Sequence, residues 1–196
     1  MKSADERALL RIGLRLEYVT LGWNVVGTVV VVLAALAARS VALAGFGLDS
    51  LIEIFASVIV VWHLTGADGH RERQALRRIG LAFFALALYI LGQTAYALIA
   101  HVHPGPSIRG IAWLAATFVA MLLLAYGKLV TGRKLGNPVL VTESRVTLID
   151  AVLAGAVLVG LVLNAALGWW WADPLAGLVI VYYAIREGWG ALRGEE

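Results

Sequence analysis

Six long runs of apolar residues constrain the fold of this chain more than any other feature of its sequence. They cover about residues 18–38, 41–64, 79–100, 110–130, 144–167 and 172–192. The hydrocarbon core of a bilayer is about 30 Å thick, and a helix needs roughly 20 apolar residues to cross it. Each run has about this length, and the short connections between the runs leave no room for a soluble domain. We therefore predict an all-α membrane protein, a bundle of six transmembrane helices.

The composition agrees with a location in the lipid bilayer. The chain is 61% hydrophobic and 15% charged, whereas soluble domains are about 45–50% apolar and roughly 25% charged. It has no cysteine, which excludes disulfides and thiolate metal ligands. The net charge of +3 could suit a nucleic acid. However, the basic residues lie at the ends of the apolar runs and not on one soluble face, so we expect no nucleic-acid partner.

The positions of the basic residues predict the orientation of the bundle. If the N-terminus is cytoplasmic, fourteen of the sixteen Lys and Arg residues lie on the cytoplasmic side, and only Arg39 and Arg109 lie outside. This asymmetry follows the positive-inside rule. We therefore predict a cytoplasmic N-terminal segment (1–16), a six-helix transmembrane domain (17–192) and a short cytoplasmic tail (193–196). The protein is expected to be multi-pass, in a plasma membrane of the prokaryotic inner-membrane type.

Two acidic residues interrupt the second apolar run. The segment GFGLDSLIEIFAS (45–57) contains Asp49 and Glu53. A charged residue at a helix centre costs about 2.5–3.5 kcal/mol on insertion. The two residues share one helix face and lie about 6 Å apart along its axis. Two unpartnered carboxylates repel each other, so one is expected to be protonated unless a divalent cation accepts both.

A third acid lies at a compatible depth in the fifth run. In the predicted orientation, Asp150 is about 9 Å from the inner boundary, and Glu53 is about 16 Å from it. Helix tilt and errors in the boundaries cover this difference. We therefore expect Asp150 and Glu53 to meet, with Asp49 one turn further out. Intramembrane acids typically mark ion or proton pathways, although a purely structural role as hydrogen-bond acceptors stays open.

Two segments of the sequence resemble a known family. The stretch SVALAGFGLDSLIEIFAS (40–57) is similar to the second transmembrane helix of the cation diffusion facilitator family, which has Ser-Ala-Leu followed by D-x-x-x-D. The stretch GWWWADPLAGLVIVYYAIREG (168–188) resembles the loop into the sixth helix of that family, where aromatic residues precede Asp-Pro. The resemblance covers about residues 17–192.

This resemblance implies a function and a site. Members of the family export zinc or other divalent metals in exchange for protons, through a cluster of ligands from the second and fifth helices. It implies that Asp49, Glu53 and Asp150 bind the transported metal. Zn²⁺ is the expected substrate, with Mn²⁺, Co²⁺ or Fe²⁺ as alternatives, and protons are the expected counter-ions. We also expect a homodimer, whose interface the sequence does not locate.

The sequence departs from the family pattern at three points. Val146 stands where the family has the His or Asp of its fifth helix, so the fourth ligand is missing or comes from water, Glu143 or Asn24. Glu53 replaces the more usual Asp. The cytoplasmic domain that usually follows the sixth helix is expected to be absent, as in a smaller branch of membrane zinc transporters. An all-oxygen site suits manganese or magnesium as well as zinc, so the choice of zinc rests on the resemblance.

Other polar residues are weaker candidates for metal binding. Asp68 and His70, in TGADGHRER, lie where some family members bind a second metal in the cytoplasmic loop, but a solvated loop is the commoner explanation. Glu17 is expected to pair with Arg15, Arg145 or Arg186 at the inner surface, or to take part in metal uptake from the cytoplasm.

Asp173 is the acid of the Asp-Pro pair before the sixth helix. We expect it to be the N-cap of that helix, because Asp is a preferred capping residue and Pro suits the first helical position.

The sequence therefore predicts a proton-coupled transporter of divalent cations. The alternative is a proton-coupled exporter of small organic cations or drugs, in which Glu53 alone exchanges protons. A membrane protein with purely structural acids is a third possibility. We expect no enzyme, because no nucleophile with a positioned base is visible.

Overall fold

The computed structural model describes residues 4–64 and 69–193, with side-chain surroundings for residues 7–55, 58, 80–137, 140–190 and 192. All the regular secondary structure in this part of the chain is α-helical, as predicted. Its six helices are α1 (Ala4–Ala38), α2 (Val41–Leu64), α3 (Gly69–Ile99), α4 (Ile108–Leu135), α5 (Pro138–Leu167) and α6 (Ala172–Arg193). All predicted apolar runs are therefore helices, and several helices extend beyond the run.

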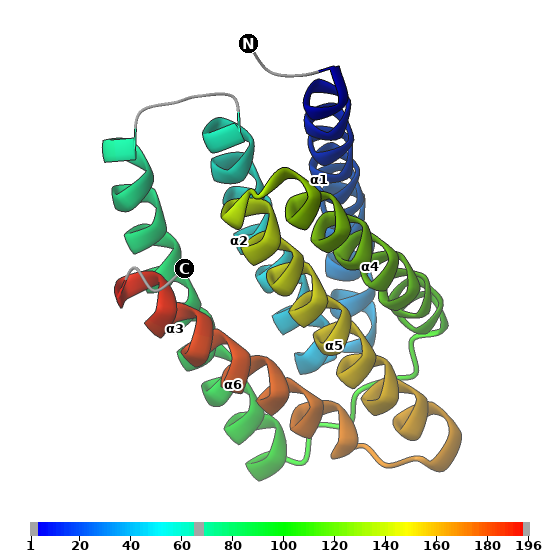
Figure 1. The fold of residues 1–196 in the computed structure, drawn as a ribbon. Coiled ribbons are helices and arrows are strands. Elements are labelled where there is room, and N and C mark those ends of the chain that lie inside the picture. The colour runs from blue at the N-terminus through cyan, green and yellow to red at the C-terminus, as the bar shows by residue number, and fades with distance from the viewer. Residues whose placement is uncertain (1–3, 65–68, 194–196) are drawn as a thin grey trace.

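The helices alternate in direction along the bundle (Figure 1). The connections α1–α2, α3–α4 and α5–α6 lie at one end, which we call the outer end. α1 begins and α6 ends toward the opposite end, which we call the inner end. The extensions of α1, α3, α4 and α5 beyond the predicted spans lie at the inner end, apart from two residues at the start of α4.

The bundle consists of two groups of helices. α1, α2, α4 and α5 form one group, in which α4 packs along α5 and α1 packs along α2. α3 and α6 form a closely packed pair beside this group (Figure 1). α2 joins the two groups, because it contacts α1 and α5 on one side and α3 and α6 on the other. α1 packs much less extensively against α5 than against α2 or α4.

Four segments of the described chain are long and apolar enough to cross a membrane: Arg7–Ala38, Gly80–Ile99, Ile108–Leu135 and Leu140–Leu167. Large apolar side chains on these segments are also exposed at the surface of the bundle, among them Leu36, Leu88 and Ile99. Such surfaces suit contact with lipid tails. The chain therefore forms an integral, multi-pass membrane protein.

The apolar core of the bundle lies toward the outer end. Its cluster of buried residues joins the last turns of α1 and α3, the first half of α2 and α6, and the second half of α5. Phe46, Leu43, Ile90 and Ile180 are among its largest fully buried side chains. The inner half of the bundle differs, because its buried positions include most of the ionisable residues.

Asp173 does not cap its own helix, so that prediction is wrong. It lies in the first turn of α6, and its carboxylate accepts a hydrogen bond from the Ser40 hydroxyl and another from the backbone N–H of Val41, at 3.0 Å. Ser40 in turn accepts the N–H of Leu43 at 3.0 Å. Together they satisfy the free amides at the start of α2, so Asp173 links α6 to α2 at the outer end.

The contact between α5 and α6 depends on a small residue, Gly160. A β-carbon at Gly160 would lie 2.7 Å from the β-carbon of Ala176 and 3.0 Å from the carbonyl oxygen of Ala172. The two helices therefore approach so closely at Gly160 that no side chain fits there.

Candidate functional site

The three predicted acids are all buried in the interior of the bundle. Asp49 and Glu53 lie on α2 and are 7% and 5% exposed, and Asp150 on α5 is 3% exposed. α2 contacts α5, so the two helices present their acids to the same interior space. Apolar side chains at these positions would cost less in a bilayer than ionisable acids do, so the burial of the acids requires an explanation beyond packing.

Glu53 and Asp150 lie side by side, as the sequence predicts. Their carboxyl groups interact electrostatically and are close enough to share a hydrogen bond when one of them carries a proton. All four of their carboxylate oxygens are buried, and none has a hydrogen-bond donor among the described residues. A buried carboxylate without a donor is costly, so this pair has an unsatisfied demand for a proton or a cation.

Asp49 lies further from this pair. Its carboxylate interacts electrostatically with Asp150 and with Glu187 of α6. In the described part of the chain, no three acidic or histidine side chains lie close enough together to hold a metal ion. A site made of Asp49, Glu53 and Asp150 would therefore require these side chains to move closer together around a cation.

A buried lysine, Lys128 of α4, dominates the inner half of the bundle. It was counted above among the cytoplasmic charges, but its side chain is 0% exposed. Its ammonium group lies 3.0 Å from Glu17 Oε2 and 3.2 Å from Glu143 Oε1, and it donates to Thr147 Oγ1 at 3.0 Å. Glu17 therefore pairs with Lys128, and the expected pairing with a surface arginine is wrong.

The remaining ligand candidates have other surroundings. Glu143 is held by Lys128 and is not free to complete a site at Asp150. Asn24 is buried, and its side-chain NH₂ group has no acceptor among the described residues. Val146 is half-buried, while its neighbour Thr147 is fully buried and bonded to Lys128.

Among the described residues, the acids of α2 and α5 lie between an apolar region and a polar one. The apolar core lies between them and the outer end. The Lys128 network, with Glu17 at 0% and Glu143 at 4% exposure, lies on their inner side. Glu143, Thr147 and Asp150 follow one face of α5, at spacings of four and three residues. A polar line therefore leads from the inner end of the bundle toward Glu53 and Asp150.

The candidates of the loop between α2 and α3 are not tested by the structure. Asp68 lies outside the described residues. His70 lies in the first turn of α3, and its side chain is also outside the described part. Metal binding by this loop stays a prediction from the sequence.

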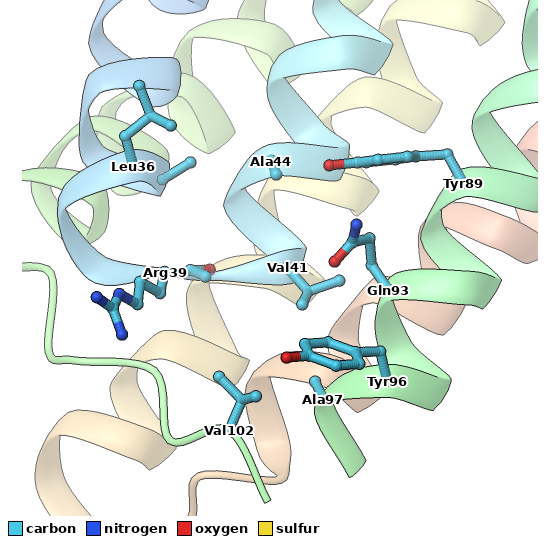
Figure 2. A pocket seen from close by; sticks show the side chains of 11 residues that line it. Leu36, Arg39, Val41, Ala44, Tyr89, Gln93, Tyr96, Ala97 and Val102 are labelled. Atoms are coloured by element: carbon cyan, nitrogen blue, oxygen red, sulfur yellow. The ribbon is translucent and has the colours of Figure 1, made fainter. Parts of the chain in front are cut away.

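A cavity of about 360 Å³ lies at the outer end, away from the acids. It is lined by residues of α1, α2 and α3, by Arg39 and Ser40 of the α1–α2 connection, and by Val102. Figure 2 shows Tyr89, Gln93 and Tyr96 projecting into it from α3. Asp49, Glu53 and Asp150 do not line it, so this cavity is not part of the carboxylate site.

Sequence reasoning missed the roles of Lys128 and Thr147. Both could have been found from helical periodicity. Lys128 lies within the fourth apolar run, two residues before its predicted end, and Thr147 lies between Glu143 and Asp150 on one face of the fifth helix. The pairing of Lys128 with Glu17 could not have been found in this way, because it depends on how α1 packs against α4.

The fold and the buried acids define a class of protein: a multi-pass helical membrane protein with ionisable groups in its interior. The comparison with known families makes the assignment specific. Residues 79–194, more than half of the chain, match the cation efflux transmembrane domain. The chain therefore belongs to the cation efflux family, and the resemblance to cation diffusion facilitators is confirmed. Cation transport is the general activity of this family.

The match covers α3 to α6 and includes Asp150, but it begins after Asp49 and Glu53. A curated protein is also similar to this chain: Transmembrane protein 163 of Xenopus laevis is 26% identical over 155 residues. This alignment covers 72% of the chain and 54% of the relative. The chain therefore spans about half the length of the curated relative that it matches.

Proposed function

We propose that this protein transports a divalent metal cation, zinc in the first place, across the membrane in exchange for protons. The transport site is formed by Asp49, Glu53 and Asp150. The observation that carries the proposal is the pair Glu53 and Asp150, whose four carboxylate oxygens are buried without a donor among the described residues. The membership of the cation efflux family supports the same conclusion.

The chemistry of the site suits an exchange of a metal for protons. In a low-dielectric interior, adjacent carboxylates cannot all stay ionised without a counter-charge. A divalent cation and protons can each supply that charge, so they compete for the same oxygens. Binding of the metal on one side releases protons, and binding of protons on the other side releases the metal.

Transport also requires the site to open to each side in turn. In the described part of the structure the acids are buried, between the apolar core and the Lys128 network. We infer that the α3–α6 pair and the four-helix group shift against each other. α2 contacts both groups, so this movement would change the surroundings of Asp49 and Glu53.

Metal binding to the purified protein tests the site. Calorimetry with zinc, manganese, cobalt and magnesium should show one preferred ion. Asp150→Asn should weaken its binding by about tenfold or more, since a charged ligand is replaced by a neutral one. Asp49→Ala should abolish zinc uptake into proteoliposomes while the protein is still produced and folded.

Asp173→Asn is the matched control, because Asp173 is also a buried acid but caps α2 at the outer end. Asn keeps a side-chain oxygen that can accept the same amide, so zinc binding should be unchanged. If the Asp49 and Asp150 variants transport zinc like the unmodified protein, the site assignment is wrong.

An exporter of small organic cations is the second candidate function. It is favoured by one observation: the described acids include a close pair, Glu53 and Asp150, but no cluster of three that could hold a metal. In that case an organic cation should drive a proton flux that depends on Glu53. Asp150→Asn should leave this transport largely intact, and calorimetry should detect no metal binding.

A further inference from the structure

Lys128 occupies a cradle made of oxygen atoms from three side chains. Its ammonium group contacts Glu17 Oε2, Glu143 Oε1 and Thr147 Oγ1 at 3.0, 3.2 and 3.0 Å. These contacts use all three N–H donors of the ammonium group. The Thr147 hydroxyl donates its hydrogen to the backbone carbonyl oxygen of Glu143 at 3.0 Å. The lone pairs of the hydroxyl oxygen are therefore available to Lys128.

The cradle has more capacity for a cation than Lys128 uses. Glu17 is fully buried, yet its Oε1 atom has no hydrogen-bond partner among the described residues. Two carboxylates surround a single positive charge, so the network has a formal charge of −1 when all three groups are ionised. The ammonium group is a tethered cation that leaves one negative charge unmatched.

The cradle lies on the same face of α5 as Asp150, a member of the carboxylate pair Glu53 and Asp150. Glu143 and Asp150 lie on the same face of α5, about 10 Å apart along the helix axis. Lys128 also interacts electrostatically with Glu53 and Asp150. A cation that moved from the inner end of the bundle to Asp150 along this face would have to pass the cradle.

We propose that Glu17, Glu143 and Thr147 form a second cation site, which the Lys128 ammonium group occupies at rest and which a divalent cation occupies in transit. The cation replaces the ammonium group as the partner of both carboxylates. Zinc accepts carboxylate oxygens at about 2.0–2.2 Å, so the cradle would contract by about 1 Å, and water would complete the coordination. The passage of the cation rests on the proposed function, whereas the existence of the cradle does not.

Removal of the tethered cation tests the site directly. Lys128→Met removes the ammonium group and keeps a long, unbranched side chain. In equilibrium dialysis of the purified, full-length protein against zinc alone, this variant should bind one more zinc ion per chain than the unmodified protein. The additional ion should persist in Lys128→Met combined with Asp150→Asn, because it does not use the carboxylate pair.

The control removes the two carboxylates of the cradle as well. Lys128→Met combined with Glu17→Gln and Glu143→Gln should lose the additional zinc ion and keep the one that depends on Asp150. If the folded Lys128→Met variant binds no more zinc than the unmodified protein, the second site does not exist. If instead the unmodified protein shows no zinc binding that depends on Asp150, the proposed function fails while the cradle can still pass its own test.

A second variant keeps Lys128 in place and does not depend on how well Lys128→Met folds. Glu17→Gln should raise the KM for zinc uptake into proteoliposomes by about tenfold, because one charged ligand of the transit site is lost. Equilibrium binding at Asp150 should be unchanged, and Glu17→Asp should restore part of the loss. If Glu17 has only a structural role, Glu17→Gln should lower the thermal stability and leave the KM for zinc uptake unchanged. That result would overturn the proposal.

Discussion

The buried network of Lys128 makes a quantitative prediction about stability. Lys128→Met leaves Glu17 and Glu143 buried without their counter-charge, because both carboxylates rely on the ammonium group at 3.0 and 3.2 Å. Removing one partner of a buried ion pair typically costs about 3–5 kcal/mol. Met retains most of the aliphatic volume of Lys, so the loss of packing adds little. We therefore expect the free energy of unfolding to fall by about 3–5 kcal/mol.

The assay is reversible unfolding in mixed micelles, followed by circular dichroism and tryptophan fluorescence. A chelator must be present, so that no divalent cation replaces the missing charge. By the relation known for soluble domains of this size, the midpoint of a thermal scan should fall by roughly 10 °C.

The combination of Lys128→Met with Glu17→Gln and Glu143→Gln decides whether charge is the cause. Replacing a whole buried ion network by neutral groups is often neutral or stabilising. This triple variant should therefore be more stable than Lys128→Met alone. The reasoning is refuted if Lys128→Met is as stable as the unmodified protein, or if the triple variant recovers nothing.

Two further predictions concern the packing of α6 and use the same unfolding assay. Asp173→Ala should cost about 1–3 kcal/mol, because the Ser40 hydroxyl and the first amides of α2 lose their acceptor; equal stability of the variant would show that water replaces the carboxylate. Gly160→Leu should separate α5 from α6 and destabilise the fold by about 1–3 kcal/mol or more. Gly92→Ala is the control, since a β-carbon at Gly92 meets no atom within 4 Å; a similar loss in both variants would contradict the packing argument.

Much of the fold follows from the sequence because a bilayer leaves few choices. Backbone groups in lipid must be satisfied within the segment, so apolar runs of this length can only be helices or parts of a barrel. Short connections then force neighbouring helices to run in opposite directions. The spacing of Asp49 and Glu53 places them on one face of α2 for the same reason, since helical periodicity is a local property.

The pairing of acids across helices was partly accessible. The depth of Asp150 along α5 predicted that it meets Glu53, and the two carboxyl groups do interact. The pattern on each helix did not show the rotation of one helix relative to another. For this reason Glu17 was assigned to a surface arginine, and Asp173 to the end of its own helix.

The sequence by itself determined that this chain is a six-helix membrane protein with costly acids in its interior, because hydropathy and helical period are encoded residue by residue. Only the tertiary structure decided which charges neutralise one another. α1 and α5 share at most a small contact, yet Lys128 of α4 joins Glu17 of α1 to Glu143 of α5. Charged side chains far apart in the sequence neutralise one another only after packing has brought their helices together. In a low-dielectric interior, this pairing determines which acids remain available to bind a cation.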